Sequence, residues 1–181
     1  SAGKDYASAR IALWWQTTHY PAKTVIIGPT NRQVQDIVWQ QVRLAHTTAK
    51  VPIGGKMLTE AKWEIAPEHY AIGFATDSPL SQLGFHSPNL LVIVTEAHAV
   101  EEKYFSTIKQ LNPSRLLMTG NPFTLGGEFY DAFHDKKGNY STIEISAFDT
   151  PNIKERRLVI PGMITVEDIE RAPEAPRIAE M

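Results

Sequence analysis

The stretch Leu90–His98, LLVIVTEAH, decides the fold of this chain. Residues 90–95 are all apolar or β-branched, and the run ends abruptly at Glu96. An uninterrupted run of this kind predicts a strand that is buried on both faces of a parallel sheet. Open α/β sheets bind their ligands beyond the carboxyl ends of the strands. We therefore expect Glu96 to lie at the rim of a ligand site, and the ligand class we expect there is a nucleotide.

Strands and helices alternate on both sides of this stretch. The predicted strands cover residues 23–28, 62–66, 69–75, 90–95 and 115–119, and the alternating segment 140–147 predicts an edge strand. The predicted helices cover residues 5–18, 31–46, 101–111 and 128–134, and Thr30 or Asn31 is the expected cap of the second. Residues 47–59 and 76–89 are expected to be loops. This order predicts an α/β fold with a mostly parallel sheet flanked by helices.

Bulk composition narrows the class of protein. The 181 residues are 43% hydrophobic and 21% charged, which is ordinary for a globular domain with a sizeable core. A net charge of −2 argues against a basic nucleic-acid face over the whole domain, while a local patch remains compatible with it. There is no cysteine, so disulfides and thiolate metal sites are excluded. No apolar run approaches the roughly 20 residues of a membrane span, and no signal peptide is visible, so we expect neither secretion nor a membrane.

The first candidate site is Gly3-Lys4-Asp5 at the start of the first helix. A phosphate loop needs glycines whose backbone N–H groups wrap phosphate oxygens, a Lys that reaches the β and γ phosphates, and a hydroxyl on Mg²⁺. Only the end of that pattern is present, and a solvated start of the chain explains the dipeptide equally simply. Gly55-Lys56 is a second such dipeptide, which we expect to be a plain loop.

The second candidate set follows two buried strands. Glu96 follows the first, and a Glu at that position can orient and deprotonate an attacking water. Thr119-Gly120-Asn121 follows the second, where the Thr and Asn side chains can bind a γ-phosphate or its attacking water. Each has a structural alternative, a turn cap for Glu96 and ordinary turn chemistry for Gly-Asn-Pro. Together with a Gly-Lys helix start they favour a nucleotide site. His98 is either a ligand or a sensor beside it, or simply a packed or hydrogen-bonded side chain.

Other motifs add little. The six histidines form no HExxH pair, so a zinc site is not expected, and no serine lies in a GxSxG elbow. Lys136-Lys137 and Lys154 with Arg156-Arg157 are candidate contacts to a nucleic-acid backbone, or simply solvated charges.

Five segments together resemble a known family. They are the Gly-Lys helix start, VIIGPTNRQVQDIVWQQVR (25–43), GFATDSPLSQLGFHSPNLLVIVTEAHAV (73–100), RLLMTGNPFTLGGEFYDAFH (115–134) and ISAFDTPN (145–152). In this order they resemble the ATPase domain of a tailed-bacteriophage terminase large subunit, the motor that packages viral DNA. The resemblance runs from Gly3 to about Asn152.

The resemblance implies a P-loop NTPase-like fold of the ASCE type, incomplete at its N-terminal strand, over residues 1–152. Residues 153–181 would then be a tail or the start of a linker toward a nuclease domain. It implies ATP and Mg²⁺ as cofactors, with Gly3 and Lys4 at the end of the phosphate loop (Walker A), Glu96 as the catalytic Glu of Walker B, and Thr119, Gly120 and Asn121 as the coupling motif. The implied partners are double-stranded DNA, a portal protein, a small terminase subunit and further copies in a ring on the procapsid, in the host cytoplasm.

Two residues depart from the family pattern. Asp5 stands where the family has Ser or Thr, and Thr95 stands where it has Asp. The carboxylate and the hydroxyl that the family has at these two positions of its metal site are thus both present here, but in exchanged positions. We hypothesise that Asp5 takes the Mg²⁺ and Thr95 holds its water. The family's trans-acting arginine is unplaced, with Arg32, Arg43 and Arg115 as candidates.

Two other functions remain open from the sequence. The departures at Asp5 and Thr95 favour a catalytically impaired nucleotide-fold module that binds ATP or a partner without turnover. A helicase-like, nucleic-acid-stimulated ATPase is the other alternative, and strand separation would distinguish it from a packaging motor.

Overall fold

The structure is a computed structural model, and it describes residues 3–76 and 84–171. The chain divides into two compact units. Gly3–Ser141 form the first, which we call the sheet unit, and the second, the C-terminal unit, includes the chain from Thr142 onward. Residues 77–83 of the predicted loop 76–89 and the last ten residues lie outside the described residues. The predicted boundary at residue 152, between an ATPase domain and a tail or linker, stays a prediction.

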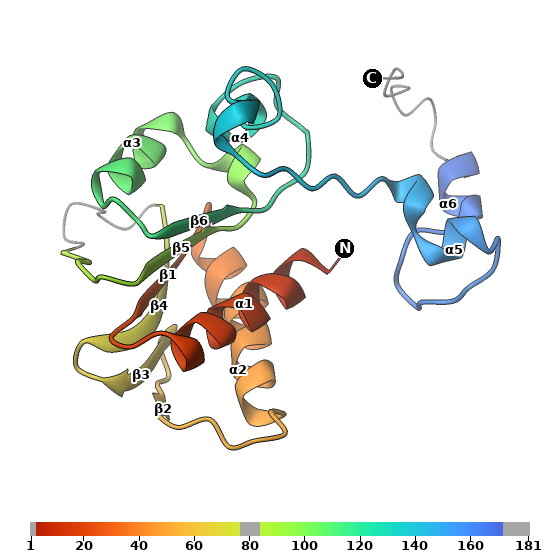
Figure 1. Cartoon of the computed structure of the whole chain (residues 1–181). Helices are drawn as coiled ribbons and strands as arrows, with labels where there is room; N and C mark the ends of the chain where they lie inside the picture. The colour runs from red at the N-terminus through yellow and green to blue at the C-terminus, as the bar shows by residue number, and fades with distance from the viewer. Residues whose placement is uncertain (1–2, 77–83, 172–181) are drawn as a thin grey trace. The chain divides into compact units, whose positions relative to one another are not determined.

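The sheet unit is built on six strands in the order β2-β3-β4-β1-β5-β6. Their bounds are β1 Lys23–Gly28, β2 Lys56–Met57, β3 Lys62–Ala66, β4 His69–Ala75, β5 Leu90–Val94 and β6 Arg115–Met118. The pairs β4-β1, β1-β5 and β5-β6 are parallel, and β2-β3 and β3-β4 are antiparallel. The predicted α/β class is therefore confirmed, with a sheet that is mixed and mostly parallel (Figure 1).

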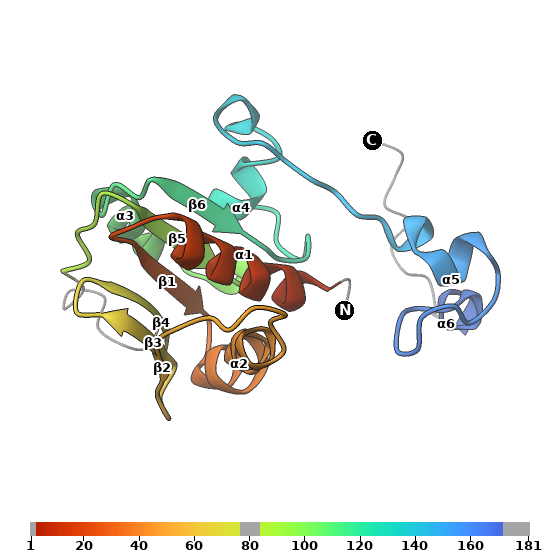
Figure 2. The ribbon, with the colours of Figure 1, turned by 60° about the horizontal axis from the view of Figure 1, so that its bottom comes forward.

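Helices cover both faces of this sheet. Figure 2 shows α1 lying across the strands on the side that also carries α2, while α3 lies on the other side. The helices are α1 (Lys4–Thr18), the π-helix η1 (Gln33–Val38) running into α2 (Trp39–Thr47), η3 (Ala97–Ala99), α3 (Glu102–Gln110), α4 (Glu128–Asp131) and η4 (Lys137–Asn139). Among the described residues, no helix is both long enough and apolar enough to cross a membrane.

The covering helices explain why the central strands are mostly apolar. All residues of β1 and β5 are buried, and successive side chains enter opposite cores. Ile26 and Ile93 face the core under α1 and α2, whereas Val25 and Val92 face the core under α3, which contributes Phe105 and Ile108. Burying a side chain of this size stabilises the fold by about 1.5–3 kcal/mol, so the two-sided core fixes the strand positions.

The C-terminal unit is small and organised by one side chain. Its described elements are η5 (Ala147–Asp149), α5 (Pro151–Lys154) and α6 (Val166–Arg171). Asn152 is buried, donates to the carbonyls of Ile160 and Met163 at 3.0 and 3.1 Å, and accepts from the N–H groups of Val159 and Ile160 at 2.8 Å each. Its amide therefore satisfies four backbone groups of the following loop.

One predicted strand is wrong. Residues 140–147 form no strand, and the side chains of Ile143 and Ile145 are 82% and 63% exposed. A strand needs a partner edge and a face on which to bury its apolar side chains, and this segment has neither in the described structure. Conversely, one observed strand was not predicted. β2 lies within the predicted loop 47–59, and its two residues are too few to show a strand-like alternation.

Candidate functional site

The candidate site lies where the start of α1 meets the carboxyl ends of β5 and β6. The Nζ of Lys4 donates to Oδ1 of Asn121 at 2.9 Å and lies 3.7 Å from Oε1 of Glu96. The side chains of Lys4 and Glu96 are 18% and 22% exposed, so the contact is largely sheltered from water. Three side chains that the sequence predicted for one site, far apart along the chain, are therefore neighbours.

Glu96 is held in an uncommon conformation. Its backbone is left-handed, with φ 47° and ψ 46°, which is rare and costly for a residue other than glycine. The next residue, Ala97, donates its N–H to the carbonyl of Thr119 at 2.8 Å, and Thr119 donates to the carbonyl of Val94 at 2.9 Å. The β5–β6 ladder thus continues past both strand ends and locks the two polar turns side by side.

His98 closes a ring of contacts in the same place. Its Nδ1 accepts the backbone N–H of Asn121 at 3.3 Å and lies 3.5 Å from Oε2 of Glu96. Gly120 makes this approach possible, because a Cβ there would lie 3.1 Å from that Nδ1. A closed ring of contacts therefore joins Lys4, Glu96, His98 and Asn121. The sequence alone did not decide whether His98 belongs to the site or is only packed beside it, and the structure places it in contact with the site.

Asp5 and Thr95 also meet at this site. The hydroxyl of Thr95, which is fully buried, donates to Oδ1 of Asp5 at 3.2 Å. A carboxylate and a hydroxyl are hard oxygen ligands, which suits Mg²⁺ when phosphate and water supply the remaining positions. No cluster of three His, Asp, Glu or Cys side chains suited to a metal occurs within residues 3–76 and 84–171. The pair by itself supplies two protein oxygens, so a Mg²⁺ held there would take its other ligands from elsewhere.

Gly3 and Thr119 complete the predicted set. Gly3 is the N-cap residue of α1, has a left-handed φ of 78°, and as a glycine has no side chain with which to cap the helix. The first N–H groups of a helix have no partner within it and carry partial positive charge, so this end of α1 suits an anion. The hydroxyl of Thr119 is buried, and it has no hydrogen-bond partner in the described part of the chain. A buried hydroxyl without a partner is uncommon in proteins, and this one lies beside Gly120 and Asn121 in the predicted coupling motif.

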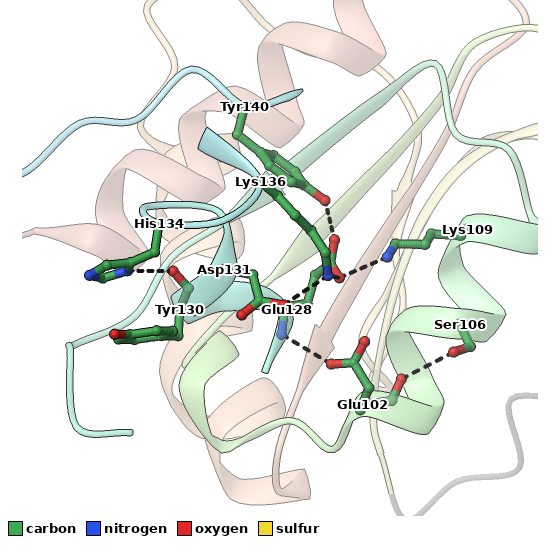
Figure 3. Close-up of polar contacts among 9 residues, drawn as sticks. All are labelled: Glu102, Ser106, Lys109, Glu128, Tyr130, Asp131, His134, Lys136 and Tyr140. Atoms are coloured by element: carbon green, nitrogen blue, oxygen red, sulfur yellow. Dashed lines mark hydrogen bonds and ion pairs between the residues drawn. The ribbon is translucent and has the colours of Figure 1, made fainter. Parts of the chain in front are cut away.

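A second polar cluster, which the sequence did not predict, surrounds Glu128 (Figure 3). Glu128 is only 1% exposed, and its carboxylate accepts hydrogen bonds from Lys109 and Lys136 at 2.7 Å each and from the hydroxyl of Tyr140 at 2.5 Å. Its backbone N–H donates to Oε2 of Glu102 at 3.0 Å. The cluster ties α4 to α3 and to the segment that leaves the sheet unit. No motif marks it, because its members are ordinary charged residues from three segments.

The surroundings of Glu128 shift its protonation strongly. Burial by itself raises the pKa of the carboxyl, but the three hydrogen bonds outweigh burial and lower the pKa from 4.5 to about 2. Burial and the bond to Glu128 raise the pKa of Tyr140 to about 12. The carboxylate is thus charged and fully bonded at neutral pH, which indicates a structural clamp rather than a proton-transfer group.

Several other predicted candidates lie elsewhere. Lys136 belongs to the Glu128 cluster, so this cation is already bound. Lys154 pairs with Asp149 at 2.9 Å, but both side chains are exposed, so that pair leaves Lys154 accessible. Arg43 is bound by the carbonyls of Thr59 and Glu60 at 2.8 and 3.0 Å, which ties it to the loop before β3. The contacts of Lys136 and Arg43 argue for structural roles.

Comparison with known proteins adds no assignment. No protein-family model matches the chain, and no curated protein matches it. Any functional conclusion therefore depends on the residues and geometry described above.

Proposed function

We propose that this chain is the ATP-hydrolysing motor domain of a viral terminase large subunit, with a P-loop NTPase-like fold, that drives packaging of double-stranded DNA into a procapsid. The observation that carries the proposal is the position of Lys4, 2.9 Å from Oδ1 of Asn121 and 3.7 Å from Oε1 of Glu96. A cation, a carboxylate and an amide converge at the carboxyl ends of two parallel strands, where open α/β sheets bind ligands.

Each residue then has a distinct role. Gly3 and the first N–H groups of α1 cradle phosphate oxygens, and Lys4 leaves its present partners to reach the β and γ phosphates. Glu96 orients the water that attacks the γ-phosphate and accepts its proton. Asn121 and the unpartnered hydroxyl of Thr119 bind the γ-phosphate side and respond to its loss.

Asp5 and Thr95 would hold Mg²⁺ in this site. The ion supplies positive charge that offsets the negative charge on the β and γ phosphates. Without it, a carboxylate at ~4 Å from a phosphate charge is repelled by about 4 kcal/mol at an effective dielectric of ~20. ATP binding is therefore expected to depend on Mg²⁺ more steeply than in a site whose loop carries a hydroxyl at this position.

The proposed partners follow from the motor assignment. They are double-stranded DNA, a portal protein, a small terminase subunit and further copies of the motor in a ring. A helicase-like ATPase would separate DNA strands, whereas a packaging motor would translocate along an intact duplex, so a strand-separation assay distinguishes the two.

One observation favours a second candidate function. Thr95 and Asp5 are hydrogen-bonded to each other, so the two metal-facing groups satisfy one another in the free protein. If Mg²⁺ does not displace that bond, the domain binds nucleotide or a partner without turnover. Binding without hydrolysis is the result that supports this candidate.

The deciding experiment measures ATP binding and turnover with Mg²⁺, in this chain and in a version extended by a complete phosphate loop. Lys4→Ala is expected to weaken ATP binding at least about tenfold, the effect of losing about 1.4 kcal/mol of charge-assisted bonding. Lys56→Ala is the matched control, because Lys56 follows a glycine in the same way but is exposed on β2. Glu96→Gln should retain binding and lose turnover by about 10²-fold or more. Equal binding by the Lys4 and Lys56 variants would overturn the proposal.

A further inference from the structure

His98 occupies a position that its packing fixes. The side chain is 13% exposed, its ring lies edge-on to Phe123 with centroids 5.2 Å apart, and it lies against Gly120, where a Cβ would be 3.1 Å from Nδ1. The charged group facing Nδ1 is Glu96, with Lys4 on the far side of that carboxylate. The imidazole is thus packed between the two turns that end β5 and β6.

One nitrogen of this ring has two partners and can serve only one of them at a time. With its proton on Nε2, the ring accepts the N–H of Asn121 at Nδ1, at the observed 3.3 Å. With a proton on Nδ1, the ring donates to Oε2 of Glu96, now 3.5 Å away, and can no longer accept from Asn121. The observed distances favour the first arrangement, in which His98 holds the Asn121 turn.

Lys4 also contacts both Asn121 and Glu96. It binds the side chain of Asn121 and lies near the second carboxylate oxygen of Glu96. Under the proposed function a phosphate draws Lys4 away, and both of these contacts are lost together. Of the side-chain bonds that tie Asn121 to the turn containing Glu96 in the described structure, the one from the Asn121 N–H to His98, two residues after Glu96, would then remain.

We propose that His98 is a positioning residue that keeps the Asn121 turn against Glu96 after Lys4 has moved to a phosphate. This role rests on the proposed function, because a phosphate has to draw Lys4 away. His98 itself makes no contact with the nucleotide. It acts through Asn121 and Glu96, whose separation sets whether a γ-phosphate and its attacking water fit between them.

The test removes Lys4 by mutation, so that it needs no nucleotide. Hydrogen exchange of the Asn121 backbone amide is measured by NMR in the parent chain, Lys4→Ala, His98→Phe and the double variant. Phe keeps a ring between Gly120 and Phe123 but has no nitrogen acceptor. We expect His98→Phe to speed exchange at Asn121 about fivefold in the parent, the usual effect of one lost hydrogen bond, and by a clearly larger factor when Lys4 is already absent.

A conservative variant separates positioning from packing. In His98→Asn the side-chain oxygen can replace Nδ1 as acceptor, so protection of the Asn121 amide should be restored although the ring is gone. His134→Phe is the matched control, since the contacts of His134 in the described structure are local: a hydrogen bond to the carbonyl of Tyr130 at 2.9 Å and stacking on the Tyr130 ring. The proposal is overturned if Lys4→Ala and the double variant exchange equally fast, or if His98→Asn behaves as His98→Phe does.

Measurements with ATP then separate the role proposed for His98 from the proposed motor function. In the version with a complete phosphate loop, His98→Phe should lower kcat about tenfold with little change in KM, because it leaves the phosphate contacts intact. Failure of the parent to bind ATP would refute the proposed function, while the exchange measurements would still decide whether His98 holds the turn. A change in KM alone would contradict the positioning role.

Discussion

At the scale of single residues, the sequence predicts which side chains meet but not how they are held. Glu96, Lys4 and Asn121 were predicted for one site because two apolar runs and a helix start place them at the same edge of a parallel sheet. The left-handed backbone of Glu96 was not predictable, since it accompanies a bond from the next residue, Ala97, to the carbonyl of Thr119, which is distant in the sequence and follows β6. The contact of His98 with Asn121 depends on that same geometry.

The exchange of Asp5 and Thr95 can be tested by stability alone. Thr95→Asp replaces a buried hydroxyl that donates to Asp5 with a second carboxylate in the same place. We expect it to lower the free energy of unfolding by about 2–4 kcal/mol through charge repulsion and loss of the donor. Adding Asp5→Ser should restore most of that loss, because a hydroxyl again faces a carboxylate. Urea denaturation of the parent, the two single variants and the double variant measures this coupling.

The same variants judge the compensation hypothesis in the complete-loop version. If Asp5 and Thr95 share Mg²⁺ as an exchanged pair, the double variant should keep Mg²⁺-dependent turnover within about tenfold of the parent, and each single variant should lose more. An active double variant beside an inactive parent would show that the exchange impairs the site.

At the scale of elements, burial decides how much the sequence predicts. The strands β1 and β5 were predictable because both of their faces are buried, which makes every residue apolar or β-branched apart from Lys23 and Gly28. The segment 140–147 has the alternation of a strand, yet forms none, because alternation records a preference and not the presence of a partner edge. The π-helical start of the second helix, Gln33–Val38, likewise leaves no mark in the periodicity.

The turn that joins β6 to α4 gives a prediction with an internal control. A Cβ on Gly120 would lie 3.1 Å from both His98 and Phe129, so Gly120→Ala requires these rings to shift by a few tenths of an ångström. We expect a loss of about 1–2 kcal/mol in stability, typical of overpacking, and faster exchange of the Asn121 amide. Gly126→Ala in the same loop meets no atom within 4 Å and should be nearly neutral. Chemical denaturation distinguishes the two, and equal effects would contradict the packing described for His98.

The clamp between α3 and α4 should appear as a pH dependence of stability. The pKa of Glu128 is lowered from 4.5 to about 2 in the folded protein, so its contribution is complete above pH 4.5 and is lost as the pH falls toward 2. A shift of this size corresponds to about 3 kcal/mol. Glu128→Gln should therefore cost about 2–3 kcal/mol at pH 7 and show a smaller loss of stability between pH 4.5 and pH 2.

The control for the clamp is Glu101→Gln. Glu101 pairs with Lys103 at 2.7 Å, but both side chains are exposed. Exposed pairs contribute about 0–1 kcal/mol, so this variant should follow the parent at every pH. Urea titrations across the pH range test both variants, and parallel curves for the parent and Glu128→Gln would contradict the assignment of the clamp.

At the scale of the whole molecule, the strand order was the part that the sequence could not supply. Alternation of strands and helices predicted the α/β class and a mostly parallel sheet, but not that β4 would lie between β3 and β1. That order depends on contacts between distant segments, such as β4 with β1 in parallel register. The candidate site was predictable without it, because β5 and β6 are neighbours whose carboxyl ends share one edge.

The division into two units predicts where the chain can be shortened. Residues 3–141 contain the sheet, both cores and the whole Glu128 clamp, so a chain that ends at Ser141 should fold with the stability of the sheet unit unchanged. A chain that ends at Asp135 loses Lys136 and Tyr140 and leaves the carboxylate of Glu128 with Lys109 as its remaining side-chain donor. Removing partners of a buried charge is strongly destabilising, and we expect a loss of about 3 kcal/mol relative to the longer chain. Urea denaturation of the two truncated chains measures the difference. Equal stability would show that residues 136–141 do not stabilise the sheet unit.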